Sequence, residues 1–462
     1  MLLHPGTSSA ARESAATHTG ALAGDWAVMS TLVRRAGVLL VDSLEELADT
    51  LDLAVRCPGI TRGGIAVLTE SGAFKALTLD LAERLALDLP TLSPSTQQAM
   101  RAALPDFIPV SNPMDLTAQS LVDPDLYRKM LIPLVADDRI GTIVLAIIQT
   151  DERTSTLKLG PIVTALRELQ PAKPIVFAGL DEGATVPAQY IRDLRSLGVP
   201  YFPTPDRAFR ALGRLGQLQA TQDAEAIPHA VTLSPGEGTL PEYLSKRLLA
   251  EVGIPFPDGS FVTRVDEAVA VAQRIGYPVV LKAQAAALSH KSDAGGVLLG
   301  ITDDDALRTA WHTLESNISR HAPGVTLDGV LVERMVGRGV ELILGARNDP
   351  DWGPILLVGF GGVQAEILKD VRLLPADLSA REIAQELRSL KSGALLDGWR
   401  GSAKLDVEAV AAIATMLGAV VRGTSAIQEI DLNPVIAYPA GRGAITLDAL
   451  IIASSPGQGN PA

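Results

Sequence analysis

The sequence has little of several features that define whole classes of protein. Only one of its 462 residues is a cysteine, Cys57, which excludes an internal disulfide framework and a thiolate metal cluster. Aromatic residues make up 4% of the chain, and no uninterrupted apolar run reaches the roughly 18 residues of a membrane-spanning helix. The first residues lack the charged-then-apolar pattern of a signal peptide. We therefore expect a cytoplasmic protein with no membrane partner.

Basic residues are also in deficit. The chain has 40 Lys and Arg against 53 Asp and Glu, which gives a formal net charge of −13. A chain of this charge lacks the basic face that binds duplex nucleic acid, so we expect no nucleic-acid partner. Hydrophobic residues make up 47% of the sequence, which excludes a disordered chain. Most of them are Ala, Leu, Val and Ile, a composition typical of parallel sheets covered by helices.

Strand and helix patterns alternate through the second part of the chain. This alternation predicts βαβ units and a flavodoxin-like, doubly wound parallel sheet. The part before it has a helical pattern at 24–35 and a short apolar run at 37–41 that we interpret as a buried strand. A segment of this size buries too little surface to be stable as a separate domain. We therefore interpret it as the end of a larger α/β unit.

These patterns divide the chain into five expected segments. The first two are the remnant of one flavodoxin-like domain and a second, complete one. A linker without periodicity follows, then a third domain with several apolar strands, then a flexible tail. In chain order the expected boundaries are 1–57, 58–219, 220–238, 239–455 and 456–462.

Two segments near the start have residues suited to phosphate chemistry. In THTGALAG, His18 lies between two hydroxyl residues and before small residues, and an imidazole in a mobile loop can carry a phosphoryl group. The alternative is a polar loop histidine that caps a helix. In TESGAFKA, Ser71 and Gly72 lie where a strand gives way to a helix, whose first N–H groups can bind phosphate. The alternative is an ordinary turn that needs glycine for its geometry.

The segment SHKSDAGGV follows the predicted strand that holds Lys282. It brings a second loop histidine, His290, together with Lys291, Ser292 and a pair of glycines. Lysine supplies a compact charge for phosphate oxygens, so this pattern suits a mobile loop over a polyphosphate. The Walker A pattern GxxxxGK[ST] is absent. The alternative is a solvated basic turn.

Carboxylates and an asparagine near the later strands complete the candidates. Glu333 and Glu341 in VERMVGRGVELILG lie beside two apolar strands, where a carboxylate can hold a purine and ribose or can simply be solvated. Asn433 and Asp448, in EIDLNP and one strand later, offer hard oxygen ligands of the kind that Mg²⁺ prefers. The alternative for Asn433 is an ordinary Asn-Pro turn.

Taken together, these segments resemble the NDP-forming acyl-CoA synthetases, the family that includes ADP-forming acetyl-CoA synthetase and succinyl-CoA synthetase. Its most specific pieces here are THTGALAG, SHKSDAGGV, GFGGVQAEILKDV and EIDLNP, which occur in the family's order between about Arg12 and Ala453. The resemblance implies a flavodoxin-like domain followed by an ATP-grasp domain. It also implies an ADP-forming ligase that converts a small carboxylic acid, CoA and ATP to acyl-CoA, ADP and phosphate through acyl phosphate and phosphohistidine.

The resemblance assigns roles to individual residues. His18 and His290 match the two catalytic phosphohistidines, and Ser71 and Gly72 match the helix start that steadies one of them. Asn433 and Asp448 match the Mg²⁺ ligands. The positions that match ATP-binding residues of the family are Lys282, Lys291, Ser292, Glu333, Val336 and Glu341.

The sequence departs from the family at its start. These enzymes usually begin with a Rossmann-type CoA-binding domain, for which we find no counterpart before His18. We therefore expect the N-terminal CoA-binding domain to be lacking. Either the chain is a truncated or alternatively started product, or a separate CoA-binding subunit supplies this domain; we also expect the chain to form an oligomer. The alternatives are a nucleotide-binding regulatory or inactive fragment, a protein-acylating relative, and an ATP-grasp carboxylate–amine ligase, which would need no His18 loop.

Overall fold

The structure is a computed structural model that describes residues 1–11, 13, 25–58, 63–217, 227–288, 291–362 and 370–454. The chain folds into two compact units. The first consists of residues 1–14 and 33–224, and the second of residues 15–32 and 225–462. No helix in the described part of the chain combines the length and the apolar character needed to cross a membrane.

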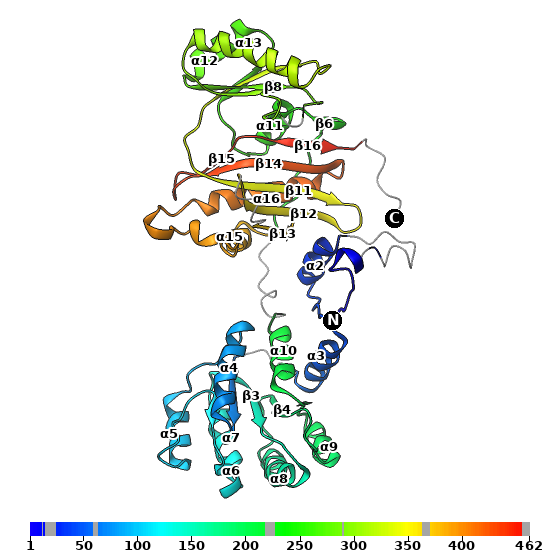
Figure 1. Ribbon diagram of the computed structural model, residues 1–462, viewed down its shortest axis with the longest axis vertical. Helices are drawn as coiled ribbons and strands as arrows, with labels where there is room; N and C mark the ends of the chain where they lie inside the picture. The colour runs from blue at the N-terminus through cyan, green and yellow to red at the C-terminus, as the bar shows by residue number, and fades with distance from the viewer. Residues whose placement is uncertain are drawn as a thin grey trace. The chain divides into compact units, whose positions relative to one another are not determined.

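The first unit is built on a five-stranded parallel sheet (Figure 1). Its strand order is β2-β1-β3-β4-β5, the flavodoxin-like order with its switch point between β1 and β3. The five strands are β1 (Gly64–Thr69), β2 (Met114–Asp115), β3 (Ile140–Ile147), β4 (Ile175–Gly179) and β5 (Tyr201–Phe202). The predicted α/β class with a doubly wound parallel sheet is therefore confirmed.

Alternation along the strands builds a core on each face of this sheet. Ile143 and Leu145 of β3 pack into one core, and Val144 and Ala146 into the other. Helices cover both faces, because a strand that is apolar on both sides must be buried on both. Those on the first face are α5 (Pro94–Ala103), α7 (Leu126–Ala136), α8 (Glu152–Leu169) and α9 (Ala188–Ser196). Those on the second are α3 (Leu44–Arg56), α4 (Gly72–Arg84) and α10 (Pro205–Gln217). A short α6 (Gln119–Val122) lies between β2 and α7 in the chain.

The start of the chain differs from the prediction at one place. The predicted helix at 24–35 is present as α2 (Trp26–Arg35). The predicted strand at 37–41 is wrong, because residue 40 forms only an isolated parallel bridge with Leu2. A single bridge does not extend into a ladder, although Val41 N–H still donates to Leu2 O at 3.0 Å.

The second unit contains a four-stranded antiparallel sheet in the order β7-β10-β8-β9. Its strands are β7 (Gly259–Val262), β8 (Val279–Gln284), β9 (Val297–Ile301) and β10 (Gly329–Arg334). Helices α12 (Val265–Ile275) and α13 (Asp304–His321) pack on one face through a core that includes Leu281 and Trp311. The other face of this sheet carries the polar side chains of the candidate site.

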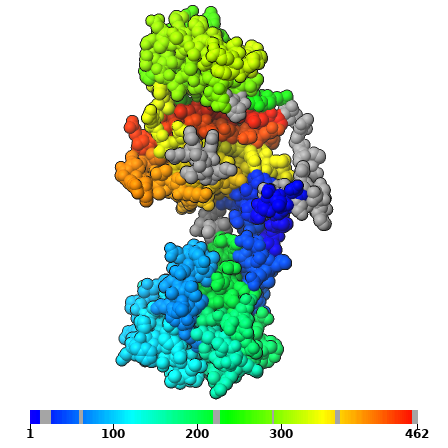
Figure 2. Space-filling view, in the orientation of Figure 1, coloured from blue at the N-terminus to red at the C-terminus, as the bar shows by residue number. Residues whose placement is uncertain are grey.

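A larger antiparallel sheet follows in the same unit. It runs β13-β12-β11-β14-β16-β6, with β15 paired to β14. Its strands are β6 (Gly238–Leu240), β11 (Val340–Asp349), β12 (Gly353–Phe360), β13 (Val371–Pro375), β14 (Ile427–Ala437), β15 (Ala444–Thr446) and β16 (Leu450–Ala453). Helices α11 (Glu242–Glu251), α15 (Ala380–Arg388) and α16 (Val407–Gly423) supply apolar residues to its core. In the space-filling view of Figure 2, residues of the smaller sheet and its helices are green to yellow-green, and the last strands of the larger sheet are orange to red.

Candidate functional site

A cavity of about 570 Å³ lies in the second unit. Its walls come from the start of α11, the segment after β8, strand β14 and the turn before β16. Both signs of charge line it, with Lys291 on one side and four carboxylates around it. The polar lining residues are Thr239, Glu242, Gln284, Lys291, Ser292, Asp293, Asp431, Asn433 and Asp448.

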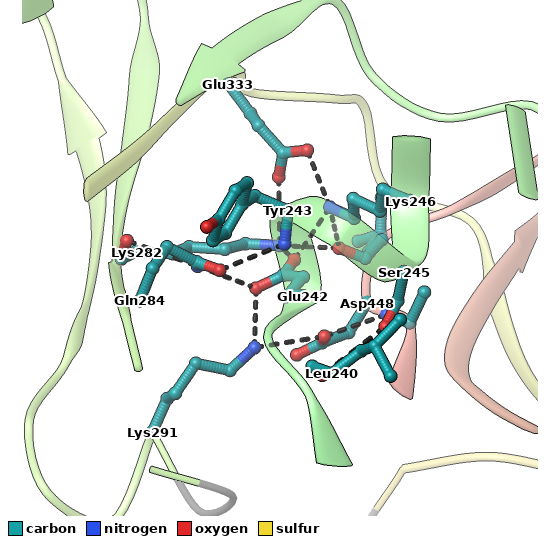
Figure 3. Close-up of polar contacts among 12 residues, drawn as sticks. Leu240, Glu242, Tyr243, Ser245, Lys246, Lys282, Gln284, Lys291, Glu333 and Asp448 are labelled. Carbon is teal, nitrogen blue, oxygen red and sulfur yellow. Dashed lines mark hydrogen bonds and ion pairs between the residues drawn. The ribbon is translucent and has the colours of Figure 1, made fainter. Parts of the chain in front are cut away.

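Two lysines and two glutamates form a buried ring beside this cavity (Figure 3). The register of β8 and β10 pairs Lys282 with Leu331 and Glu333 with Val280. Lys282 and Glu333 are therefore diagonal neighbours on the sheet face opposite the core. Glu242 and Lys246 are four residues apart on α11, which places both on one face of that helix. The two elements thus bring the four charges together.

Positive and negative side chains alternate around the ring. Glu242 Oε1 lies 2.7 Å from Lys246 Nζ and 2.8 Å from Lys282 Nζ. Glu333 Oε1 lies 2.6 Å from Lys246 Nζ, and Glu333 Oε2 lies 2.9 Å from Lys282 Nζ. All four side chains are at most 10% exposed. Each buried charge therefore has opposite charges in direct contact, which buried ion pairs require.

Lys291 extends this network to the cavity wall. Its Nζ lies 2.5 Å from Glu242 Oε2 and 3.1 Å from Asp448 Oδ1. Asp448 is about one-third exposed, and the Lys291 side chain is 11% exposed. The sequence-predicted residues Lys282, Lys291, Glu333 and Asp448 therefore lie in one connected cluster.

The pKa values of the cluster follow from burial and neighbouring charge. Burial would raise the pKa of Glu242, but the Lys282, Lys246 and Lys291 ammonium groups outweigh it and hold this pKa well below its usual value. Burial and the neighbouring Lys282 lower the pKa of Lys246. The pKa of Lys282 is raised because Glu242 and Glu333 outweigh its burial. We conclude that Glu242 is ionised and that Lys282 keeps its proton.

The predicted metal ligands lie on the cavity wall. Asn433 is on β14, whose register pairs Asp431 with Leu450, and Leu447 N–H donates to Pro434 O at 2.9 Å. These contacts bring the Asn433 region beside the turn that holds Asp448. Burial and the Glu242 carboxylate raise the pKa of Asp448, and burial, Glu429 and Asp448 raise that of Asp431 to about 6.

A fully protein-ligated metal site is not found in the described part of the chain, where His, Cys, Asp and Glu form no suitable group of three or more. The oxygens of Asn433 and Asp448 still fit Mg²⁺, because this ion usually takes one or two protein oxygens and completes its shell with phosphates and water. The donor set does not suit a metal that needs nitrogen or sulfur ligands.

The other predicted residues of the second unit lie at different places. Ser292 lines the cavity, Val336 lies half-buried in the loop after β10, and Glu341 is an exposed residue of β11. His18 and His290 lie outside the described residues.

Ser71 and Gly72 belong to the first unit, at the start of α4. The Ser71 hydroxyl caps this helix by accepting a hydrogen bond from Phe74 N–H at 3.2 Å. The predicted helix start is therefore present. A carboxylate lies close to it, since a Cβ atom at Gly72 would be 3.2 Å from Asp115 Oδ2. An anion bound there would meet this negative charge.

Two residues that are central to the site, Glu242 and Lys246, were not predicted from the sequence. Their signal in the sequence is the Glu-x-x-x-Lys spacing in LPEYLSK at the start of an amphipathic helix. Such a spacing is common on solvated helices, where it adds only a weak surface ion pair. Only the packing of α11 against β8 and β10 shows that both side chains are buried.

Comparison with known proteins agrees with this arrangement. Residues 232–452 match the ATP-grasp domain family, and residues 1–54 match the succinyl-CoA ligase like flavodoxin domain. The beta subunit of ADP-forming acetate–CoA ligase I from Pyrococcus furiosus is 38% identical over 208 residues, which cover 45% of this chain and 89% of that subunit. The chain belongs to the ADP-forming acyl-CoA synthetase family.

Two longer members of this family match nearly the whole chain. A trans-feruloyl-CoA synthase from an unidentified prokaryote is 49% identical over 456 residues, which cover 98% of this chain. An ADP-forming acetate–CoA ligase I from Archaeoglobus fulgidus is 30% identical over 458 residues, which cover 96% of this chain. The chain spans 64% of the length of each of these two relatives.

Proposed function

We propose that this chain is the nucleotide-binding part of an ADP-forming acid–CoA ligase. The reaction would join a carboxylic acid to CoA and convert ATP to ADP and phosphate. The observation that carries the proposal is the cavity of the ATP-grasp region. Lys291, Asn433 and Asp448 line this cavity, and the buried ring that contains Lys282 lies beside it. Lysine ammonium groups and a divalent cation are the means by which proteins neutralise a polyphosphate during phosphoryl transfer.

Mg²⁺ fits this proposal through the oxygens of Asn433 and Asp448. When bound, it would neutralise charge on the nucleotide phosphates. Lys291, whose Nζ lies 3.1 Å from Asp448 Oδ1, would contact the same phosphates. Glu242 and Glu333 would keep the neighbouring lysines ionised and oriented.

Phosphate would pass through the two predicted phosphohistidines. His290 directly precedes Lys291 in the sequence, and Lys291 lines the cavity, which supports a role for His290 in receiving phosphate from ATP. His18 lies in the segment that we expect to carry the second phosphohistidine. Imidazole attacks phosphorus readily and forms a labile intermediate, so two histidines can relay the group between sites.

The partners of the reaction are CoA and a small carboxylic acid. Some relatives divide the enzyme between subunits, since the ADP-forming acetate–CoA ligase II of Pyrococcus furiosus has a beta and an alpha subunit, each of which matches part of this chain. We infer that this chain works with a CoA-binding part of this kind, in the cytoplasm. The relative with 49% identity is a feruloyl-CoA synthase, so ferulate is the first acid to test.

The test has two stages. Calorimetry with Mg·ATP should show binding to the purified chain. Release of ADP should then depend on both acid and CoA, with ferulate, acetate and 4-hydroxybutyrate compared as substrates. A chain that binds ATP but never releases ADP, even with a CoA-binding subunit present, would be a nucleotide-binding regulator. Absence of Mg·ATP binding would overturn the proposal.

A further inference from the structure

Protein oxygens surround two lysines of the buried ring. Lys282 Nζ donates hydrogen bonds to Glu242 Oε1 and Leu447 O, and it forms an ion pair with Glu333 Oε2 at 2.9 Å. Lys246 Nζ donates hydrogen bonds to Glu333 Oε1 at 2.6 Å and Leu447 O at 2.7 Å, and it forms an ion pair with Glu242 Oε1 at 2.7 Å. Each ammonium group therefore has three protein oxygens in contact, as many as it has N–H groups, and a phosphate oxygen would compete with them.

Glu242 contributes most to this arrangement. Its Oε1 accepts a hydrogen bond from Lys282 and forms an ion pair with Lys246, and its Oε2 accepts from Lys291 at 2.5 Å and from Gln284 Nε2 at 3.2 Å (Figure 3). The side chain is 1% exposed. A single carboxylate therefore contacts four side chains, three lysines and a glutamine, whose N–H groups would also suit a phosphate group.

Lys291 differs from the other two lysines. Among the described residues its Nζ contacts two oxygens, both of them carboxylate oxygens, from Glu242 and Asp448. Among the described residues that line the cavity are Glu242 and Lys291, whereas Lys246, Lys282 and Glu333 do not line it. Lys291 is thus the cation that an incoming anion meets first, and Glu242 is the group that holds it.

Counted by formal charge, the cluster is neutral. Its three lysines are balanced by Glu242, Glu333 and Asp448. An anion gains little from a neutral cluster until a carboxylate moves away from a lysine. Phosphate oxygens accept the same charge-assisted hydrogen bonds as carboxylate oxygens, so one can take the place of the other.

We propose that Glu242 is a positioning residue whose carboxylate stands in for a phosphate group, holds Lys291 at the cavity wall, and is displaced from it by an anionic ligand. This inference rests on the proposed nucleotide function. The stand-in role and a purely structural role predict opposite changes in anion affinity when Glu242 is neutralised. A structural role predicts that neutralising Glu242 lowers both stability and anion affinity. A stand-in predicts lower stability and higher anion affinity, because a competing negative charge is removed.

The test uses Glu242→Gln in the full chain. Calorimetry with metal-free inorganic tripolyphosphate should show binding at least about threefold tighter than in the unchanged protein, because the amide carries no charge to compete for Lys291. The Tm without ligand should fall. Asp406→Asn is the matched control, since it removes the charge of a carboxylate of the same unit that accepts hydrogen bonds from the backbone N–H groups of Ala409, Gly441 and Gly443 and does not line the cavity. The control should leave tripolyphosphate affinity unchanged.

Equal or weaker tripolyphosphate binding by Glu242→Gln would overturn the inference. If Glu242→Gln does not fold, Glu242→Asp replaces it, since this change keeps the charge but withdraws the carboxylate from Lys291. It should give a smaller gain in affinity in the same direction, and no gain would overturn the inference. Mg·ATP binding by the unchanged protein, together with no gain in either variant, would reject the stand-in alone. Binding of neither ligand by the unchanged protein would reject the nucleotide function and the stand-in with it.

Discussion

Lys158 Nζ and Glu70 Oε2 lie 2.7 Å apart in the interior of the first unit, although 88 residues separate them in the sequence. The side chains are 7% and 3% exposed. Tyr127 and Ser120 donate hydrogen bonds to the other oxygen of Glu70. Glu70 directly precedes Ser71, the cap of α4, so this ion pair fixes the turn from which that helix begins.

Removing one partner of this pair should destabilise the first unit. Lys158→Met leaves the Glu70 carboxylate buried without its counter-ion, and we expect a loss of about 3–5 kcal/mol in the free energy of unfolding, measured by urea denaturation. The double variant Glu70→Gln, Lys158→Met removes both charges and should lose less. Equal losses in the single and double variants would show that the pair contributes through packing rather than charge.

Lys291 should contribute directly to nucleotide affinity. Lys291→Met removes the cation of the cavity wall and should weaken Mg·ATP binding by about 1.5–3 kcal/mol, the range for a hydrogen bond to a charged group. Calorimetry measures the change. Lys173→Met provides a control from the first unit, where that lysine donates to backbone oxygens of Leu134 and Asp137. Equal affinities for Mg·ATP in the Lys291 variant and the unchanged protein would contradict the assignment.

Asp448 should affect ATP binding mainly through the metal ion. Asp448→Asn keeps the shape of the side chain but removes the charge that Mg²⁺ favours. We expect ATP affinity to fall far more in the presence of Mg²⁺ than in its absence, as measured by calorimetry in both conditions. Equal losses with and without Mg²⁺ would show that Asp448 is not a metal ligand.

Phosphate should enter the protein at His290 before it reaches His18. Incubation with γ-labelled ATP should give a phosphoprotein that is labile in acid and stable in base. The label should be absent in His290→Ala and present in His18→Ala. A label that persists in His290→Ala would mean that phosphate passes directly from ATP to another residue.

Cys57 should react slowly with alkylating reagents while the protein is folded. Burial, with a smaller contribution from Asp52, raises the pKa of its thiol to about 12. The reactive thiolate is therefore a negligible fraction at pH 8, whereas an unfolded cysteine is partly ionised there. Iodoacetamide labelling followed by mass spectrometry should be slow for the folded chain at pH 8 and fast in urea. Equal rates in both conditions would contradict the buried position.

The sequence by itself determined the class of fold and several residues of the candidate site in the second unit. Alternating strand and helix patterns predict a parallel sheet because each βαβ unit needs its own helix, and β1, β3 and β4 lie where apolar runs occur. Local patterns also placed Lys282, Lys291 and Asp448, because each lies in or next to a short motif with a recognisable composition.

Only the tertiary structure decided which side chains meet and which groups they use. The apolar run at 37–41 has the composition of a strand, but in the described part of the chain it forms a single bridge, with Leu2. Glu242 and Lys246 look like a surface pair in the sequence, yet packing buries them against Lys282 and Glu333. The strength and the role of a charged group depend on burial and on partners far away in the chain, and local sequence patterns do not contain either.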